Sequence, residues 1–202
     1  VTVMSALFPD TNMSVLWSNM GVSFEEHDVI GKDLRYDVHA NGANIEIRYM
    51  YDALYSENKD KKHDLFGLMA KAVKSETAPD EPFLWLANIR HDDGAFDGML
   101  GKQLPNTPHG QNGYQDYHKI AFMPTLNYRP FHCGFLCSVG FDSLSLQRTF
   151  AFQSTYQACM RTSIRNPQDN ASKTIYVFSK QIALWLQQLF QGSKVVQIPD
   201  LP

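Results

Sequence analysis

Three polar side chains late in the chain, Gln157, Arg161 and Arg165, stand four residues apart. On an α-helix this spacing places an amide and two guanidiniums on one face. A guanidinium stays charged at ordinary pH and presents a rigid fork of donors that matches the oxygens of a phosphate group. The spacing therefore predicts a contact to the terminal phosphate of a nucleotide held by a neighbouring domain. The alternative is a solvated helix face with no further role.

The same segment also carries an apolar stripe, formed by Phe152, Tyr156, Met160 and Ile164. Apolar and cationic stripes side by side are typical of a helix that lies half in a core, with its arginines at the rim. We expect this helix to cover residues 149–165. It should stop at Asn166-Pro167, because the residue before a proline avoids the α conformation.

The rest of the chain alternates between strands and helices. Alternating apolar and polar residues predict a half-buried strand at residues 45–50, and apolar runs predict buried strands at 83–87 and 120–123. Further strands are expected at 174–178 and at the short β-rich run 1–6. Amphipathic spacing predicts helices at residues 13–20, 65–73 and 182–189, the first capped by Asp10 or Thr11 and the last by Ser179. This alternation predicts an α/β fold, with a largely parallel central sheet flanked by helices on both faces. In such sheets ligands bind at the carboxyl ends of the strands.

Composition restricts the kind of protein further. Hydrophobic residues make up 44% of the 202 residues, which is enough for the core of one domain. A net charge of −3 provides no global basic field for nucleic acid. No apolar run approaches the roughly 20 residues that cross a bilayer, so we expect no membrane partner. Three cysteines are too few for a disulfide framework, which favours the cytoplasm.

Four segments, taken in order, are similar to the later motifs of superfamily 2 helicases of the DEAD/DEAH-like kind. Residues 3–7, with Ser5 and Ala6, resemble the Ser-Ala-Thr segment that ends the first RecA-like domain. Residues 83–88 resemble the first strand of the second RecA-like domain. Residues 107–112 resemble the glycine-rich fifth motif, and residues 157–165 resemble the sixth motif, which carries arginine fingers. The chain thus resembles the C-terminal RecA-like domain of a bacterial or phage helicase-family protein.

The resemblance also has departures. The two arginines stand four residues apart instead of three, and Met160 takes the place of a glycine. Gly98 to Gln103 is the nearest approach to a phosphate-binding loop, but it lacks the spacing and the hydroxyl that such a loop needs. No Asp-Glu-x-His motif is present either. Because the chain opens on Val-Thr-Val without an initiator Met, we expect it to be a piece of a longer protein.

The resemblance implies a role for each matching position. Residues 1–24 would end the preceding RecA-like domain and its connection, and residues 25–202 would form the helicase C-terminal domain. ATP and Mg²⁺ would be held mainly by the N-terminal RecA-like domain, and single-stranded DNA or RNA would be the track. Arg161 and Arg165 would be catalytic, and Gln157, Gly110 and Asn112 would contact nucleotide. Thr107 and Thr125 would bind nucleic acid, whereas Ser5 and Ala6 would couple the two domains.

Other interpretations stay open. His109, His118, His132, Cys133 and Cys137 together form a possible zinc ligand set. Cys133, Cys137 or Cys159 could act as a nucleophile with a histidine, and His91, Asp92 and Asp93 could form an acid–base cluster. A non-catalytic α/β module that keeps the helicase-like fold and only binds a partner is the alternative from a different class.

Overall fold

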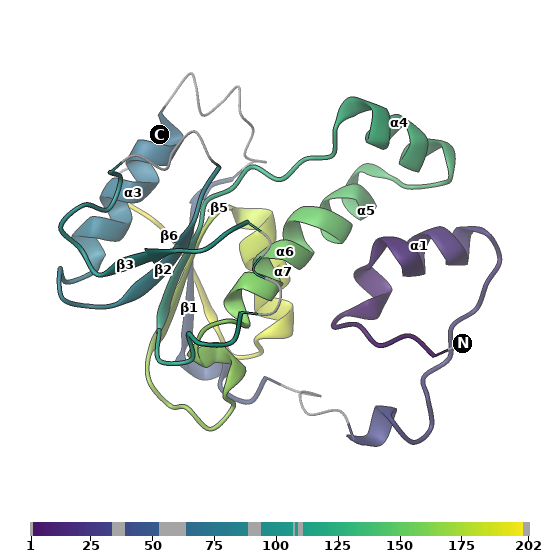
Figure 1. The fold of residues 1–202 in the computed structure, drawn as a ribbon, viewed down its shortest axis with the longest axis horizontal. Helices are drawn as coiled ribbons and strands as arrows, with labels where there is room; N and C mark the ends of the chain where they lie inside the picture. Colours follow the sequence, from purple (N-terminus) through teal and green to yellow (C-terminus); the bar gives the residue numbers. More distant parts are fainter. Residues whose placement is uncertain are drawn as a thin grey trace. The chain divides into compact units, whose positions relative to one another are not determined.

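The computed structural model describes residues 2–33, 39–52, 64–88, 94–106, 108 and 111–199. The chain divides into two compact units (Figure 1). The smaller unit comprises Val1–Asp37 and Leu126–Ser154, and the larger unit comprises Val38–Thr125 and Thr155–Pro202. The compact units divide the chain at other positions than the boundary predicted between residues 24 and 25. That boundary concerns the longer protein and stays a prediction.

The larger unit is built on a six-stranded sheet with the strand order β3-β2-β4-β5-β1-β6. All neighbouring strands run parallel. The strands are β1 Ile45–Tyr51, β2 Phe83–Leu86, β3 Gly101–Gln103, β4 Lys119–Phe122, β5 Lys173–Ser179 and β6 Lys194–Gln197. The parallel sheet confirms the predicted fold class, and its arrangement is consistent with a RecA-like domain.

Helices cover both faces of this sheet (Figure 1). Helix α3, Leu65–Glu76, packs Met69 and Val73 into one core cluster together with Phe83 and Tyr176 of the sheet. Helix α7, Lys180–Leu189, lies against β1, β5 and β6 on the other face, and α6, Gln153–Cys159, lies on that side as well. Ser179 caps α7 as predicted, since its hydroxyl accepts a hydrogen bond from the Gln181 amide.

The smaller unit is mostly helical. Helix α1, Asn12–Asn19, begins at Thr11, whose hydroxyl accepts from the Ser14 amide, as the sequence predicts. Helices α4, Pro130–Ser138, and α5, Ser143–Gln147, are followed by a π-helical segment, Arg148–Phe152. The side-chain amide of Asn19 donates to the Val139 carbonyl over 3.0 Å. The side-chain amide of Gln153 donates to the Leu7 carbonyl over 3.0 Å. These hydrogen bonds join the first segment of the smaller unit, residues 1–37, to its second segment, residues 126–154.

Two sequence predictions are wrong. The predicted strand at residues 1–6 is absent from described residues 2–6, where Met4 is exposed. The predicted helix 149–165 is α-helical only over Gln153–Cys159, after which a turn leads into a 3-10 helix, Ser163–Arg165. Thr162 accounts for this break, because its hydroxyl donates to the Cys159 carbonyl and accepts from the Ile164 amide.

Candidate functional site

Arg161 and Arg165 do not share a helical stripe, yet their guanidiniums meet at one atom. Nη1 of Arg161 lies 2.9 Å from Oδ1 of Asn112, and Nη1 of Arg165 lies 2.8 Å from the same oxygen. The first guanidinium also donates to the Gln111 carbonyl over 3.2 Å. Three predicted site residues, two arginines and an asparagine about fifty positions earlier, are therefore brought together.

The charge of this arginine pair is not compensated within the described part of the chain. Neither guanidinium forms an ion pair there, and the oxygen that both contact is a neutral amide. Nε of Arg161 is buried and has no hydrogen-bond partner among the described residues. Burial, and then the positive charge of Arg165, lower the pKa of Arg161. An anion placed here would offset the repulsion between the two guanidiniums and could accept a hydrogen bond from Nε of Arg161.

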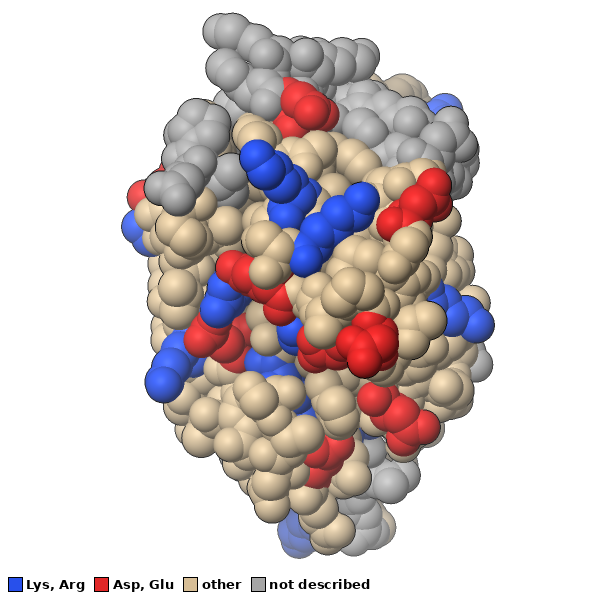
Figure 2. Space-filling model, turned by 90° about the vertical axis from the view of Figure 1, so that its left-hand side faces the viewer, with Lys and Arg blue, Asp and Glu red and all other residues tan. Residues whose placement is uncertain are grey.

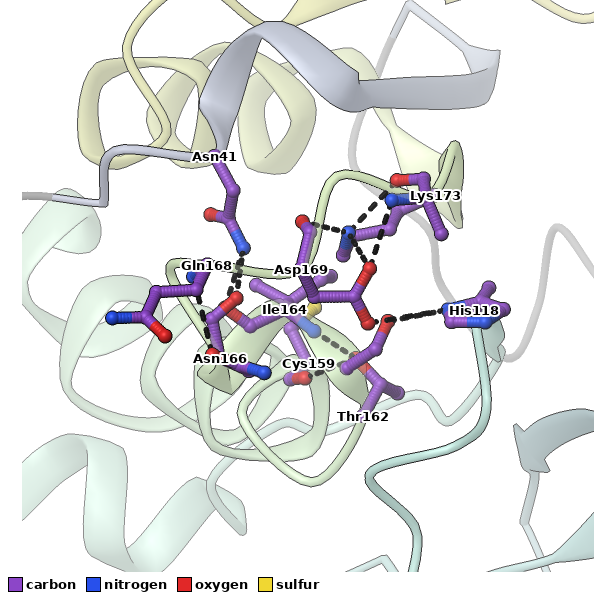
Figure 3. Close-up of polar contacts among 11 residues, drawn as sticks. Asn41, His118, Cys159, Thr162, Ile164, Asn166, Gln168, Asp169 and Lys173 are labelled. Carbon is purple, nitrogen blue, oxygen red and sulfur yellow. Dashed lines mark hydrogen bonds and ion pairs between the residues drawn. The ribbon is translucent and has the colours of Figure 1, made fainter.

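The segment that carries Arg165 is held by a buried asparagine (Figure 3). Nδ2 of Asn41 donates to the carbonyls of Ile164, over 3.1 Å, and Asn166, over 2.9 Å. Asn41 is only 2% exposed, and its hydrogen bond to the Ile164 carbonyl is buried. They fix the backbone on both sides of Arg165 and limit where its side chain can reach.

A buried lysine holds the rest of this segment. The Lys173 side chain is fully buried, and its Nζ donates to the carbonyls of Asp169 and Ala171, each over 2.8 Å. Nζ also lies 3.2 Å from Oδ1 of Asp169 (Figure 3). The hydrogen bond from the Ala171 amide and the nearby Lys173 ammonium lower the pKa of Asp169, which therefore stays ionised. These hydrogen bonds hold residues 169–171 against the side chain of Lys173, the first residue of β5.

The loop before β4 joins the same arrangement. The Ser163 amide donates to the Tyr117 carbonyl over 3.0 Å, and the Thr174 amide donates to the His118 carbonyl over 3.0 Å. Nδ1 of His118, on a partly exposed side chain, lies 2.8 Å from the hydroxyl of the buried Ser163. The loop bearing Asn112 is thereby fixed beside the segment bearing both arginines.

The arginine pair lies at the amino ends of the strands. Tyr117 and His118 directly precede β4, residues 163–172 directly precede β5, and these strands are parallel. The amino ends of β4 and β5 therefore share one edge of the sheet. The expectation that ligands bind at the carboxyl ends stays a prediction, and the arginine pair lies at the opposite edge. At the carboxyl edge, β1 and β5 instead end beside an ion pair of 2.8 Å between Lys180 and Asp52.

The remaining predicted site residues are spread over the chain. Gln157 is half-buried on α6 and forms no hydrogen bond to the arginine pair. Thr125 follows β4 at the carboxyl edge, with a buried hydroxyl that has no partner among the residues described. Ser5 and Ala6 are exposed in the smaller unit. Thr107 and Gly110 lie outside the described residues.

Sequence reasoning missed the residues that hold the arginines in place. Asn41, Asp169 and Lys173 were not singled out, although a lysine at the start of a buried strand was a usable signal. A side chain in that position must either reach water or find oxygen partners. Lys173 does the second.

The rival chemistries gain no support from the structure. Across the described ranges, no three His, Cys, Asp or Glu side chains gather in a way that could hold a metal ion, and His109 lies outside those ranges. Burial raises the pKa of Cys159 far above its usual value, so this thiol stays protonated and is a poor nucleophile. Cys133 and Cys137 are free thiols on α4. His91, Asp92 and Asp93 lie outside the described residues.

Comparisons of the chain with protein-family models, curated proteins and solved structures give no match. In the part of the chain that the structure covers, no helix combines the length and apolar character needed to span a bilayer.

Proposed function

We propose that this chain is the second motor domain of an ATP-dependent superfamily 2 helicase or translocase. In this proposal, Arg161 and Arg165 act as arginine fingers toward ATP held with Mg²⁺ by an N-terminal RecA-like domain. The observation that carries the proposal is the meeting of two guanidiniums on one neutral oxygen, with no carboxylate paired to either in the described residues. Such a pair is suited to the charge that builds up on a transferring phosphoryl group.

The rest of the chain supports this division of labour. The sheet is of the α/β type that nucleotide-driven motors use, and Asn41 and Lys173 hold the arginine segment rigidly. Rigid donors need little reorganisation when charge develops on the substrate. Mg²⁺ bound in the N-terminal domain would supply the remaining neutralisation of the phosphates. Three free thiols are in keeping with a cytoplasmic protein.

Nucleic acid would use a different part of the chain. Thr107 and Thr125 are the residues proposed for this contact, and the Thr125 hydroxyl at the carboxyl edge of the sheet is buried in this structure. Basic and acidic side chains are interspersed over the face in Figure 2, so a broad basic field is not available there. Contacts to single-stranded DNA or RNA would therefore depend on local hydroxyls and backbone amides.

The test is nucleic-acid-stimulated ATP hydrolysis by a protein that contains both RecA-like domains. We expect Arg161→Ala to lower the stimulated kcat by roughly 10³-fold or more, because it removes an interaction made mainly in the transition state. The affinity for ATP should change little, since the N-terminal domain grips the nucleotide. Full turnover by this variant would remove the assignment and would leave the non-catalytic interaction module as the better description.

A further inference from the structure

Asn112 is an unusual partner for two cations. Its single amide oxygen accepts from both Arg161 and Arg165, over 2.9 and 2.8 Å. One carbonyl-type oxygen has two lone pairs, so this atom fully occupies its acceptor capacity with the two guanidiniums. Asn112 is itself exposed, so its side chain can turn into solvent.

We propose that the Asn112 amide oxygen stands in for an oxygen of a polyphosphate terminus, which displaces it and binds between the two guanidiniums. This inference deepens the proposed function and uses the same arginine pair. It adds that the pair binds a terminal phosphate in this chain alone, and that Asn112 sets the affinity by occupying the site when no ligand is present.

The chemistry favours exchange of one oxygen for another. Hydrogen bonds from a guanidinium to a charged phosphate oxygen are shorter and stronger than those to a neutral amide. A phosphate group also presents several oxygens, so each guanidinium could keep a separate partner, and the unused Nε of Arg161 would gain a nearby acceptor. Asn112 holds the two like charges together only weakly, so that an anion can compete.

A carboxylate at the same position would behave differently. Asp at position 112 would form a permanent ion pair with both arginines, and an incoming anion would have to break it. Within the described residues of the larger unit, the four other buried or half-buried cations Arg48, Lys119, Lys173 and Lys180 each lie beside a carboxylate. The neutral residue at position 112 is therefore the feature that keeps the arginine pair available.

The experiment measures binding of inorganic pyrophosphate to this chain by calorimetry at low ionic strength. We expect Asn112→Asp to weaken binding at least about tenfold, whereas Asn112→Ala should bind several-fold more tightly than the unmodified chain because it removes the competing oxygen. The double variant Arg161→Gln/Arg165→Gln should lose binding. Gln188→Glu, which adds the same charge at an exposed position of α7, is the matched control and should leave the affinity unchanged.

Thermal unfolding of each variant checks that the fold is kept, and Asn112→Asp should melt no lower than the unmodified chain. The proposal is overturned if the unmodified chain fails to bind pyrophosphate, or if Asn112→Asp binds it equally well. It is also overturned if Asn112→Ala loses as much affinity as Asn112→Asp. Tighter binding of a single-stranded oligonucleotide without terminal phosphates than of pyrophosphate would contradict the assignment to a polyphosphate end. Because no hydrolysis is measured, this inference can fail while the motor function stands, and the reverse.

Discussion

At the scale of single residues, the larger unit treats its cations in two ways. Arg48 pairs with Glu46 and Glu76, and the ammonium of Lys119 lies 2.7 Å from Glu81. The arginine pair, Arg161 and Arg165, has only neutral oxygens as partners within the described residues. The unmatched charge of the arginine pair is the feature on which the proposed binding of a phosphate depends. The spacing of the motif predicted these two arginines as site residues. Their shared contact with Asn112 depends on the end of α6 at Cys159, which the spacing did not predict.

Lys173 gives a prediction about how the arginine segment is held. Replacing this fully buried lysine by methionine, Lys173→Met, removes the donor to the Asp169 and Ala171 carbonyls. We expect the free energy of unfolding to fall by roughly 2 to 4 kcal/mol, because buried acceptors lose a charged partner. Urea denaturation measures this change. Lys194→Met, at an exposed lysine that opens β6, is the control and should stay within about 0.5 kcal/mol of the unmodified chain.

At the scale of elements, strong periodicity predicted most of the fold. The strands β1, β2, β4 and β5 and the helices α1, α3 and α7 lie where alternation, apolar runs and capping residues placed them. The short edge strands β3 and β6 were not predicted, because each forms a strand through its pairing with a neighbouring strand and has little apolar pattern of its own. The end of α6 was missed since Thr162 redirects the backbone locally, which an apolar stripe does not reveal.

Gly42 gives a prediction about how β1 is set in place. It opens the 3-10 helix Gly42–Asn44 that leads into β1, and an added Cβ would collide with the backbone carbonyl of Gln191. We expect Gly42→Ala to lower the free energy of unfolding by roughly 1 to 3 kcal/mol, because neither backbone can move without disturbing the sheet. Gly113→Ala, where an added Cβ meets nothing within 4 Å, should be neutral or slightly stabilising. Equal losses in chemical denaturation of both variants would contradict this account of Gly42.

At the scale of the whole molecule, the parallel sheet gives the larger unit two distinct edges. The amino edge carries the arginine pair and its supports, and the carboxyl edge carries Thr125 and the Lys180–Asp52 ion pair. The fold class could be predicted because a parallel sheet buried on both faces leaves a clear apolar pattern. The edge at which the arginines gather could not, because it depends on contacts between loops that are distant in the sequence, such as Ser163 with Tyr117.

The most direct test of the central claim is a structure of a protein with both RecA-like domains, bound to ADP, Mg²⁺ and aluminium fluoride. We predict that the Arg161 or Arg165 guanidinium will have left Asn112 and will donate to the fluoride that mimics the transferring phosphoryl group. Both guanidiniums still resting on the Asn112 oxygen, with the nucleotide out of their reach, would contradict the claim.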